Sequence, residues 1–232
     1  MRVVSLVPSA TETLVAWGVT PVGVTRFCEH PELPSVGGTK DPDLDAVQAL
    51  RPDLVVVCQE ENRAQDAAAL QAAGVRLFVF RIDAVDDVAP QLGALRADLG
   101  LDPAPPPQLP PAATEPTSRA FVPIWRRPWM TMSGRCYGSS LLARLGVVNV
   151  FADEDDRYPE TTLEEAAARA PDVVLAPSEP YPFGARHVDE LATVAPVLLV
   201  DGQDLFWWGV RTPAALDRLG AALDDLGHRG RG

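Results

Sequence analysis

Cys28 and His30 stand two positions apart in the segment RFCEHP, so their side chains point the same way in an extended chain. With a carboxylate such as Glu60 or Glu61, they would form a ligand set for a transition-metal ion. The same pair could instead serve as a nucleophile and its base. Because no C-x-x-C or H-E-x-x-H spacing occurs, we favour a buried thiol beside a surface histidine.

Other catalytic motifs are absent from the sequence. There is no G-x-S-x-G nucleophile elbow, and neither G-x-x-x-x-G-K-[ST] nor G-x-G-x-x-G occurs. The sequence therefore suggests no reaction, and we expect a protein that is not an enzyme and that requires no cofactor.

Aromatic residues gather in three segments of the second half of the chain. Each segment follows an apolar run that reads as a strand, and ligands of open α/β sheets bind beyond the carboxyl ends of the strands. Three adjacent aromatics cannot all face one core, so the pattern predicts an aromatic-lined cleft. The segments contain Trp125 and Trp129, then Tyr181 and Phe183, then Phe206, Trp207 and Trp208.

The apolar runs predict the fold class. RVVSLV, DLVVVC, RLFVF, AFVPIW, DVVLA and VLLVD lack polar alternation, which is typical of parallel strands covered on both faces. Helical patterns alternate with them, so we predict an α/β protein of two Rossmann-like lobes with mostly parallel sheets. After the first run, Ser9 and Glu12 have the spacing of a capping box with Ser9 as the N-cap.

Internal repeats support two lobes of like topology. LDAVQALRPDLVVVC from Leu44 matches LEEAAARAPDVVLAP from Leu163, and LQAAGVRLFVF from Leu70 matches LATVAPVLLVD from Leu191. A third pair joins TLVAWGVTPVGV from Thr13 with LLARLGVVNVF. Because the matches keep their order, chance is a poor explanation.

A helix and a proline-rich connector separate the repeats. The helix is predicted from Asp87 to Gly100, with Asp87 as its cap and Pro90 in its first turn. Seven of the fifteen residues from Asp102 to Pro116 are proline, which predicts a stiff, extended, solvated connector. The predicted parts are an N-terminal lobe (1–82), the interlobe helix plus connector (83–118) and a C-terminal lobe (119–232).

Composition limits the classes of binding partner and the cellular compartments that we expect. The net charge of −12 argues against nucleic acid. No run of 18 apolar residues exists, so no membrane insertion is expected. The three cysteines fit a reducing compartment. The N-terminus reads directly into a strand pattern, so we expect a cytoplasmic protein, or a periplasmic or cell-surface one if a leader has been removed or the start is misassigned.

The sequence resembles the iron/cobalamin-type solute-binding proteins of ABC importers, also called helical-backbone metal receptors. The resemblance covers almost the whole chain. It is carried by RVVSLVPSATETLVAWGVTPVGVTRFCEHP, by VGGTKDPDLDAVQALRPDLVVVCQEENRAQDAAALQAAGVRLFVF, and by SLLARLGVVNVF and TTLEEAAARAPDVVLAP.

The resemblance implies two lobes joined by one long helix, with a shallow cleft that binds a metal chelate such as cobalamin, heme or a ferric siderophore. It also implies an acidic residue on each lobe that docks a permease, for which Glu60 or Glu61 and Glu179 are candidates. Three features depart from the family: the chain starts at its first strand, the interlobe helix is shorter and the proline-rich connector replaces its second half, and no motif fixes the acidic docking residues. The segments CEHP, EENR, WRRPW and EPYPF look more like a cytosolic subgroup. The matching cleft loops are Pro8 to Thr11, Phe27 to His30, Gln59 to Asn62, Trp125 to Trp129, and Phe206 to Trp208.

The first hypothesis is therefore a monomeric receptor for cobalamin, another corrinoid or an iron chelate, with an ABC permease as a candidate partner. One alternative is a bare transition-metal ion on Cys28, His30 and Glu60; another is a cytosolic enzyme that reuses the fold. The expected ligand-binding residues are Pro8, Ser9, Phe27, Cys28, His30, Gln59, Glu60, Asn62, Trp125, Arg126, Trp129, Arg135, Glu179, Tyr181, Phe206, Trp207 and Trp208.

Overall fold

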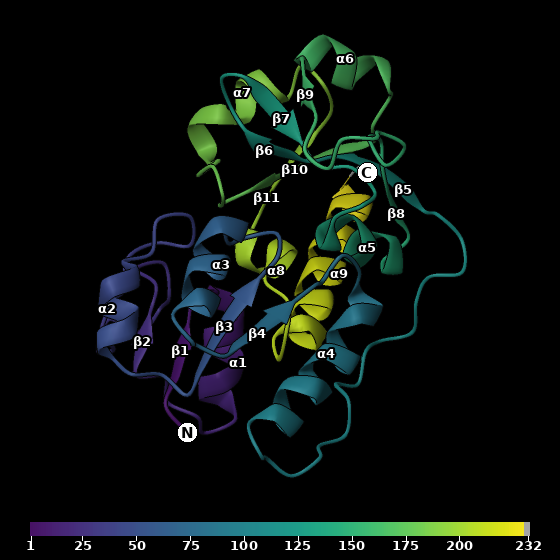
Figure 1. Ribbon diagram of the computed structural model, residues 1–232. Helices are drawn as coiled ribbons and strands as arrows, with labels where there is room; N and C mark the ends of the chain where they lie inside the picture. Colours follow the sequence, from purple (N-terminus) through teal and green to yellow (C-terminus); the bar gives the residue numbers. More distant parts are fainter. Residues whose placement is uncertain (230–232) are drawn as a thin grey trace. The chain divides into compact units, whose positions relative to one another are not determined.

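The computed structural model describes residues 1–229 and divides into two compact units (Figure 1). The first unit contains Met1–Ile82, Asp86–Pro107 and Trp208–Val210. The second contains Asp83–Val85, Gln108–Trp207 and the chain from Arg211 onward. No helix among the described residues is long and apolar enough to cross a membrane.

The first unit is built on one parallel four-stranded sheet of order β2-β1-β3-β4. Its hydrophobic core includes the fully buried Val4, Val55 and Leu70. The strands are β1 (Val3–Ser5), β2 (Gly23–Val24), β3 (Leu54–Cys58) and β4 (Leu77–Phe80). The helices are α1 (Pro8–Ala16), α2 (Leu44–Ala49), α3 (Ala64–Ala72) and α4 (Val85–Asp98), of which α4 begins at a residue of the second unit.

The second unit repeats this sheet and adds a small antiparallel one. The parallel strands are β5 (Ser118–Phe121), β8 (Val147–Asn149), β10 (Val173–Pro177) and β11 (Val197–Val200). The antiparallel sheet contains β6 (Pro123–Trp125), β7 (Trp129–Thr131) and β9 (Glu160–Thr161). The helices are α5 (Tyr137–Arg144), α6 (Leu163–Ala168), η1 (Ala185–His187), α7 (Val188–Leu191), α8 (Gly202–Phe206) and α9 (Thr212–Arg229).

The two parallel sheets have the same topology, as the internal repeats predict. The order β2-β1-β3-β4 of the first unit corresponds to β8-β5-β10-β11 in the second. In each sheet, every neighbouring pair of strands is parallel. The α/β fold class predicted from the apolar runs is confirmed.

The repeat extends to individual hydrogen bonds at the turn before β3 and β10. The amide of Arg2 donates to Oδ2 of Asp53 at 2.6 Å, and its Nη2 donates to the carbonyl of Leu50, the C-cap of α2, at 2.8 Å. Arg119 repeats both contacts, with Oδ2 of Asp172 at 2.8 Å and the carbonyl of the α6 C-cap at 2.9 Å. In both units an arginine therefore satisfies the end of a helix and aligns two paired strands.

The run AFVPIW is not one strand, contrary to our prediction. It divides into β5, which pairs in parallel with β8 and β10, and β6, which pairs antiparallel with β7. Pro123 lacks an amide hydrogen and cannot continue the ladder of a central strand. The chain therefore leaves the parallel sheet there and builds the β6–β7 hairpin.

The capping box predicted at Ser9 is wrong. Helix α1 begins at Pro8 with Val7 as the N-cap, because proline is pre-organised for the first helical position. Ser9 falls inside the first turn and is 2% exposed, and its Oγ has no hydrogen-bond partner among the described residues.

The helix predicted from Asp87 begins earlier, at Val85. The buried face of α4 includes Val85, Val88, Leu92 and Leu95. Because packing of this apolar face stabilises the helix, the helix extends back to Val85. Pro90 consequently lies inside α4 instead of in the first turn, and one backbone hydrogen bond is lost there.

The proline-rich connector has no regular secondary structure, but its second part is held by hydrogen bonds (Figure 1). The amide of Ala113 donates to the carbonyl of Arg144 at 2.8 Å, and the amide of Thr117 donates to that of Gly146 at 2.7 Å. Arg144 Nη2 donates to the carbonyl of Pro110 at 3.3 Å. The second part of the connector is thus anchored to the end of α5 instead of being wholly solvated.

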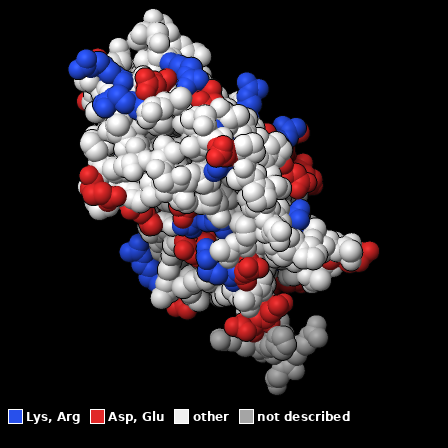
Figure 2. Space-filling model, turned by 90° about the horizontal axis from the view of Figure 1, so that it is seen from below, with Lys and Arg blue, Asp and Glu red and all other residues white. Residues whose placement is uncertain are grey.

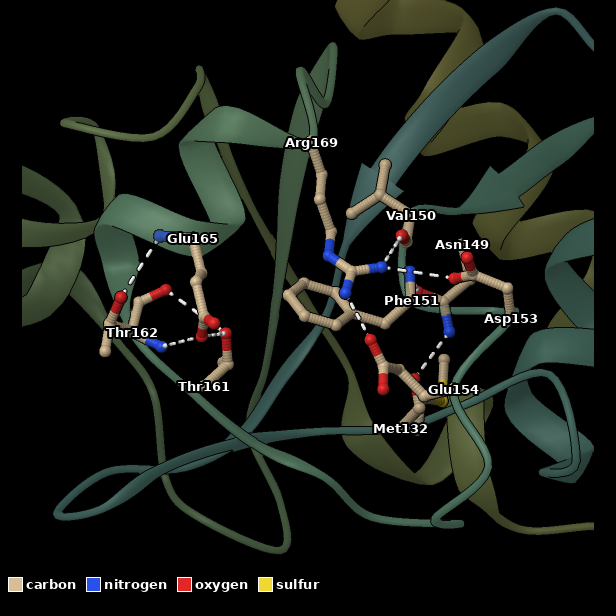
Figure 3. Close-up of polar contacts among 10 residues, drawn as sticks. All are labelled: Met132, Asn149, Val150, Phe151, Asp153, Glu154, Thr161, Thr162, Glu165 and Arg169. Carbon is tan, nitrogen blue, oxygen red and sulfur yellow. Dashed lines mark hydrogen bonds and ion pairs between the residues drawn. The ribbon is translucent and has the colours of Figure 1, made fainter.

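Arg169 organises the loop that follows β8 (Figure 3). Its Cζ lies 4.0 Å from the centroid of the Phe151 ring. Its guanidinium donates to the carbonyl of Val150 at 3.1 Å, lies 3.1 Å from Oδ1 of Asp153, and also forms an ion pair with Glu154. An arginine held by carboxylates over an aromatic ring recurs in the candidate site.

Candidate functional site

The loops at the carboxyl ends of the first unit's strands form what we call the first-unit loop cluster, residues 26–28, 38–41 and 59–62. Phe27 is 52% exposed there, and the Cζ of Arg26 lies 4.8 Å from the centroid of its ring. Nη2 of Arg26 is 3.0 Å from both carboxylate oxygens of Asp41. The arginine beside the exposed ring is therefore already paired.

A glycine and two side-chain contacts hold this cluster together. A Cβ on Gly38 would collide with the Asp41 carboxylate and lie 2.8 Å from Nη2 of Arg26. Nζ of Lys40 donates to the carbonyl of Glu60 at 2.6 Å, and Nδ2 of Asn62 donates to that of Thr39 at 2.9 Å. The loops after β2 and β3 are thus linked through the segment 38–41, which sequence reasoning did not single out.

Asn62 holds the loop together and has little surface left for contact with a ligand. It is 8% exposed, its Oδ1 accepts from the amide of Cys58 at 2.8 Å, and its Nδ2 also donates to the carbonyl of Leu6 at 3.1 Å. Gln59 is exposed, and Glu60 is half-buried, in the same loop.

The structure does not assemble the metal set proposed from Cys28 and His30. The Cys28 thiol lies 3.2 Å from Oγ1 of Thr11 and 3.3 Å from Oγ1 of Thr25. Nδ1 of His30 pairs with Glu32 at 2.9 Å. Across residues 1–229, no group of three His, Cys, Asp or Glu side chains is arranged to hold a metal ion. Cys28 and His30 lie in one loop, as their spacing indicates, but their side chains contact different residues.

Five rings form the second-unit aromatic cluster: Trp125, Trp129, Tyr181, Phe183 and His187. Trp125 is 44% exposed and meets Tyr181 edge-on, with centroids 5.6 Å apart. Trp129 stacks on Phe183 at 5.9 Å, and Tyr181 lies 4.7 Å from Phe183. The β6–β7 hairpin and the segment after β10 supply these residues, so two of the three predicted aromatic segments meet.

Arg126 joins the hairpin to α7 beside this cluster. Its Nη2 lies 2.9 Å from Oε2 of Glu190, and its Cζ lies 5.9 Å from the Trp129 centroid. Hydrogen bonds with Glu190 and Tyr181 raise the pKa of Arg126. Glu190 carried no signal in the sequence, because it belongs to a short helix after the aromatic segment.

His187 is buried at 3% exposure within the aromatic cluster. The centroid of its ring lies 5.5 Å from that of Tyr181 and 5.4 Å from that of Phe183. The amide of Gly184 donates to Nδ1 at 3.1 Å, and Nε of Arg186 approaches Nε2 at 3.2 Å. Burial lowers the pKa of His187, and the charges of Arg186 and then Arg126 lower it further, against an opposing effect of Glu190.

This environment predicts acid sensitivity. In the unfolded chain His187 takes up a proton near pH 6.5, whereas in the folded chain it does so only at lower pH. The contribution of neutral His187 to the free energy of unfolding is therefore complete above about pH 6.5 and is lost as the pH falls below it. Denaturant unfolding should show a free energy that decreases from pH 7 to pH 5, with a smaller decrease in His187→Gln. An equal slope in wild type and His187→Gln would contradict the prediction.

The third aromatic segment is divided between the two units. Trp207 is half-buried in the second unit, where the Cζ of Arg211 lies 5.0 Å from its ring centroid. Nη1 of Arg211 is 3.3 Å from Oδ1 of Asp204, and its Nη2 donates to Oε1 of Gln203 at 2.9 Å. Asp204 is 3% exposed and also pairs with Arg218.

Trp208 packs in the first unit and does not offer the open ligand surface that we predicted. It is 3% exposed, and its ring centroid lies 4.4 Å from that of Phe80. The amide of Val210 donates to Oγ1 of Thr13 at 3.3 Å, and a Cβ on Gly209 would collide with the same oxygen. The segment thus anchors on α1 and β4.

The remaining predicted residues vary in exposure. Arg135 is exposed, with Nη1 3.1 Å from the carbonyl of Asp155. Glu179 is half-buried against Gly202, whose Cβ would lie 2.6 Å from the Glu179 amide nitrogen. Pro8 is buried and Phe206 is half-buried. On the face shown in Figure 2, acidic and basic side chains are interspersed.

Comparison with known proteins finds one family model and several curated relatives. A family model described as periplasmic binding protein matches residues 3–93. The vitamin B12-binding protein of Salmonella typhimurium strain LT2 is 26% identical over 192 residues, covering 75% of this chain and 71% of that protein. The vitamin B12-binding protein of Vibrio cholerae serotype O1 (strain M66-2) is 25% identical over 191 residues, covering 75% and 69%.

Solved structures match over nearly the whole chain. The periplasmic vitamin B12-binding protein BtuF of Vibrio cholerae has a TM-score of 0.74 at 20% identity, with 96% of both chains covered. The periplasmic heme-binding protein RhuT from Roseiflexus sp. RS-1 has a TM-score of 0.77 at 21% identity, with 97% and 98% covered. Residues 3–93 thus match the periplasmic binding protein family in sequence, and the whole chain shares the fold of solved periplasmic binding proteins.

Proposed function

We propose that the protein binds a metal chelate of the tetrapyrrole type, with cobalamin and heme as the first candidates, and that the first-unit loop cluster and the second-unit aromatic cluster each offer a surface suited to such a ligand. The observation that carries the proposal is an exposed aromatic ring in each unit, close to an arginine that lies near a ring. Phe27 lies in the loop after β2 with Arg26 near its ring, and Trp125 ends β6, one residue before Arg126, whose Cζ lies near the Trp129 ring. The names of the relatives, vitamin B12-binding and heme-binding proteins, agree with it.

Ring burial supplies the main binding energy in this proposal. Aromatic side chains offer large, rigid apolar surfaces to a flat macrocycle. A ring that loses about 100 Å² of exposed surface contributes about 2.5 kcal/mol at 25 cal/mol per Å². Phe27 and Trp125 have enough exposed surface for such contacts. Tyr181 meets Trp125 edge-on, and Tyr181 in turn packs on Phe183, which stacks on Trp129.

We further propose that the chelate is bound without turnover and is passed to a permease partner. The relatives support this, because a solved neighbour is described as an ABC transporter substrate-binding protein. Docking through Glu60 or Glu61 and Glu179, a monomeric state and a cytoplasmic location remain predictions from the sequence.

Titration of the purified protein with cyanocobalamin, heme and free cobalt or ferric ions tests the proposal by absorbance and tryptophan fluorescence. We expect saturable one-to-one binding of a chelate that Cys28→Ala and His30→Ala leave unchanged. If no chelate saturates, and a free ion binds stoichiometrically and is lost in Cys28→Ala, the bare-metal alternative replaces the proposal.

A further inference from the structure

Three arginines of the two units lie beside aromatic rings that we predicted as ligand contacts, and each is paired with a carboxylate. Arg26 lies beside Phe27 and pairs with Asp41 at 3.0 Å. Arg126 lies near Trp129 and pairs with Glu190 at 2.9 Å. A third arginine, beside Trp207, pairs with the buried carboxylate of Asp204 at 3.3 Å. The same arrangement thus occurs once in the first unit and twice in the second, in addition to Arg169 over Phe151.

From this pairing we infer that Asp41, Glu190 and Asp204 determine ligand specificity by acting through the arginines, and that they select a chelate with a largely uncharged periphery over one with several carboxylates. The inference rests on the proposed function and names the ligand class for the same site.

The physical reason is competition for the guanidinium groups. An arginine binds a carboxylate strongly when its N–H donors are free and can form parallel bonds. Arg26 already directs Nη2 at both oxygens of Asp41, and Arg126 already directs Nη2 at Glu190. A carboxylate on the ligand would therefore meet a neutralised ion pair and a nearby negative charge, so it would gain little over an uncharged group.

The pairing also leaves the rings able to stack. An arginine over an aromatic face is held electrostatically, and its carboxylate partner limits the positions that it can adopt. Phe27 and its arginine remain largely exposed, whereas the Arg126 side chain is 22% exposed. The carboxylates thus act as positioning residues for a stacking surface and reduce its free positive charge.

The charged groups on the two candidate ligands indicate which ligand class the site favours. Heme carries two propionate carboxylates on its edge, whereas the corrin ring of cobalamin carries neutral amides and the molecule has one phosphodiester. Arg127 is exposed between the two tryptophans of the hairpin and forms no ion pair in the described part of the chain. One unpaired arginine suits a ligand with one anionic group better than one with two.

The test compares heme with heme dimethyl ester, which has the same ring and metal but no propionate charge, and with cyanocobalamin. Dissociation constants are measured for wild type, for Asp41→Asn, for Glu190→Gln and for the double variant. These two carboxylates are partly exposed in the structure, so the variants are expected to fold. Asp98→Asn is the matched control, because it removes the partner of Arg76 in an ion pair of 2.6 Å with no aromatic ring beside it.

Wild type should bind heme no more tightly than its dimethyl ester, and should bind cyanocobalamin at least as well. The double variant should improve the ratio of heme to ester affinity by about three- to tenfold, an effect that weakens at high salt. If wild type binds cyanocobalamin but neither porphyrin, the double variant should gain measurable heme binding. Asp98→Asn should leave the ratio unchanged.

Two results would overturn the inference while the proposed function stands: heme binding several-fold tighter than ester binding in wild type, or an unchanged ratio in a folded double variant. Failure of every chelate to bind wild type would instead remove the proposed function itself.

Discussion

Trp208→Ala is expected to lower the free energy of unfolding by about 3–5 kcal/mol, the usual cost of removing a buried tryptophan or phenylalanine side chain. Trp208 is 3% exposed and packs on Phe80, which is fully buried. Because whole domains are stable by only about 5–15 kcal/mol, such a loss is a large fraction of the total. Urea unfolding followed by circular dichroism would measure it.

Trp125→Ala is the control for this stability prediction, because that side chain is 44% exposed. It should change the free energy of unfolding by less than about 1 kcal/mol. If Trp208→Ala were as stable as wild type and lost chelate binding instead, Trp208 would be a ligand contact, as its position in the FWW segment first indicated.

Trp125→Ala is expected to weaken chelate binding by about 10- to 30-fold, which corresponds to an aromatic contact of about 2 kcal/mol at the centre of an interface. Trp125 is held edge-on by Tyr181 at a centroid distance of 5.6 Å. A braced ring loses little conformational entropy when a macrocycle stacks on it. The dissociation constant for cyanocobalamin or heme, whichever binds, would be measured by absorbance titration.

Trp17→Ala serves as the matched tryptophan control for the binding prediction. Trp17 is half-buried at the C-terminal end of α1, with the Cζ of Arg96 4.8 Å from its ring centroid. It therefore keeps the arginine–tryptophan arrangement but lies away from the strand-end loops. Equal losses of affinity in Trp17→Ala and Trp125→Ala would contradict a binding role for the second-unit aromatic cluster.

The sequence alone determined the fold to a large extent. Its repeats, such as Leu44 onward against Leu163 onward, predicted two sheets of like topology, and the equivalent contacts of Arg2 and Arg119 agree in detail. Apolar runs suffice for this because burial on both faces of a parallel strand requires a continuous apolar pattern. The aromatic segments after β6 and β10 were likewise predicted from sequence and meet in the structure.

Local signals failed where a neighbouring residue or a distant contact outweighed them. The spacing of Ser9 and Glu12 matches a capping box, but Pro8 starts α1 two residues too early for it. The same spacing at Thr162 and Glu165 does form the capping box (Figure 3), with the Thr162 hydroxyl 3.1 Å from the Glu165 amide. The proline before Ser9 explains the different outcome.

Only the tertiary structure decided which aromatic residues remain open and which arginines are paired. Trp207 and Trp208 are adjacent in sequence, yet one lies beside Arg211 and the other is buried against Phe80. The partners of Arg26 and Arg126 lie 15 and 64 residues away along the chain. Contacts at such separations depend on how the loops are packed, which no local pattern records.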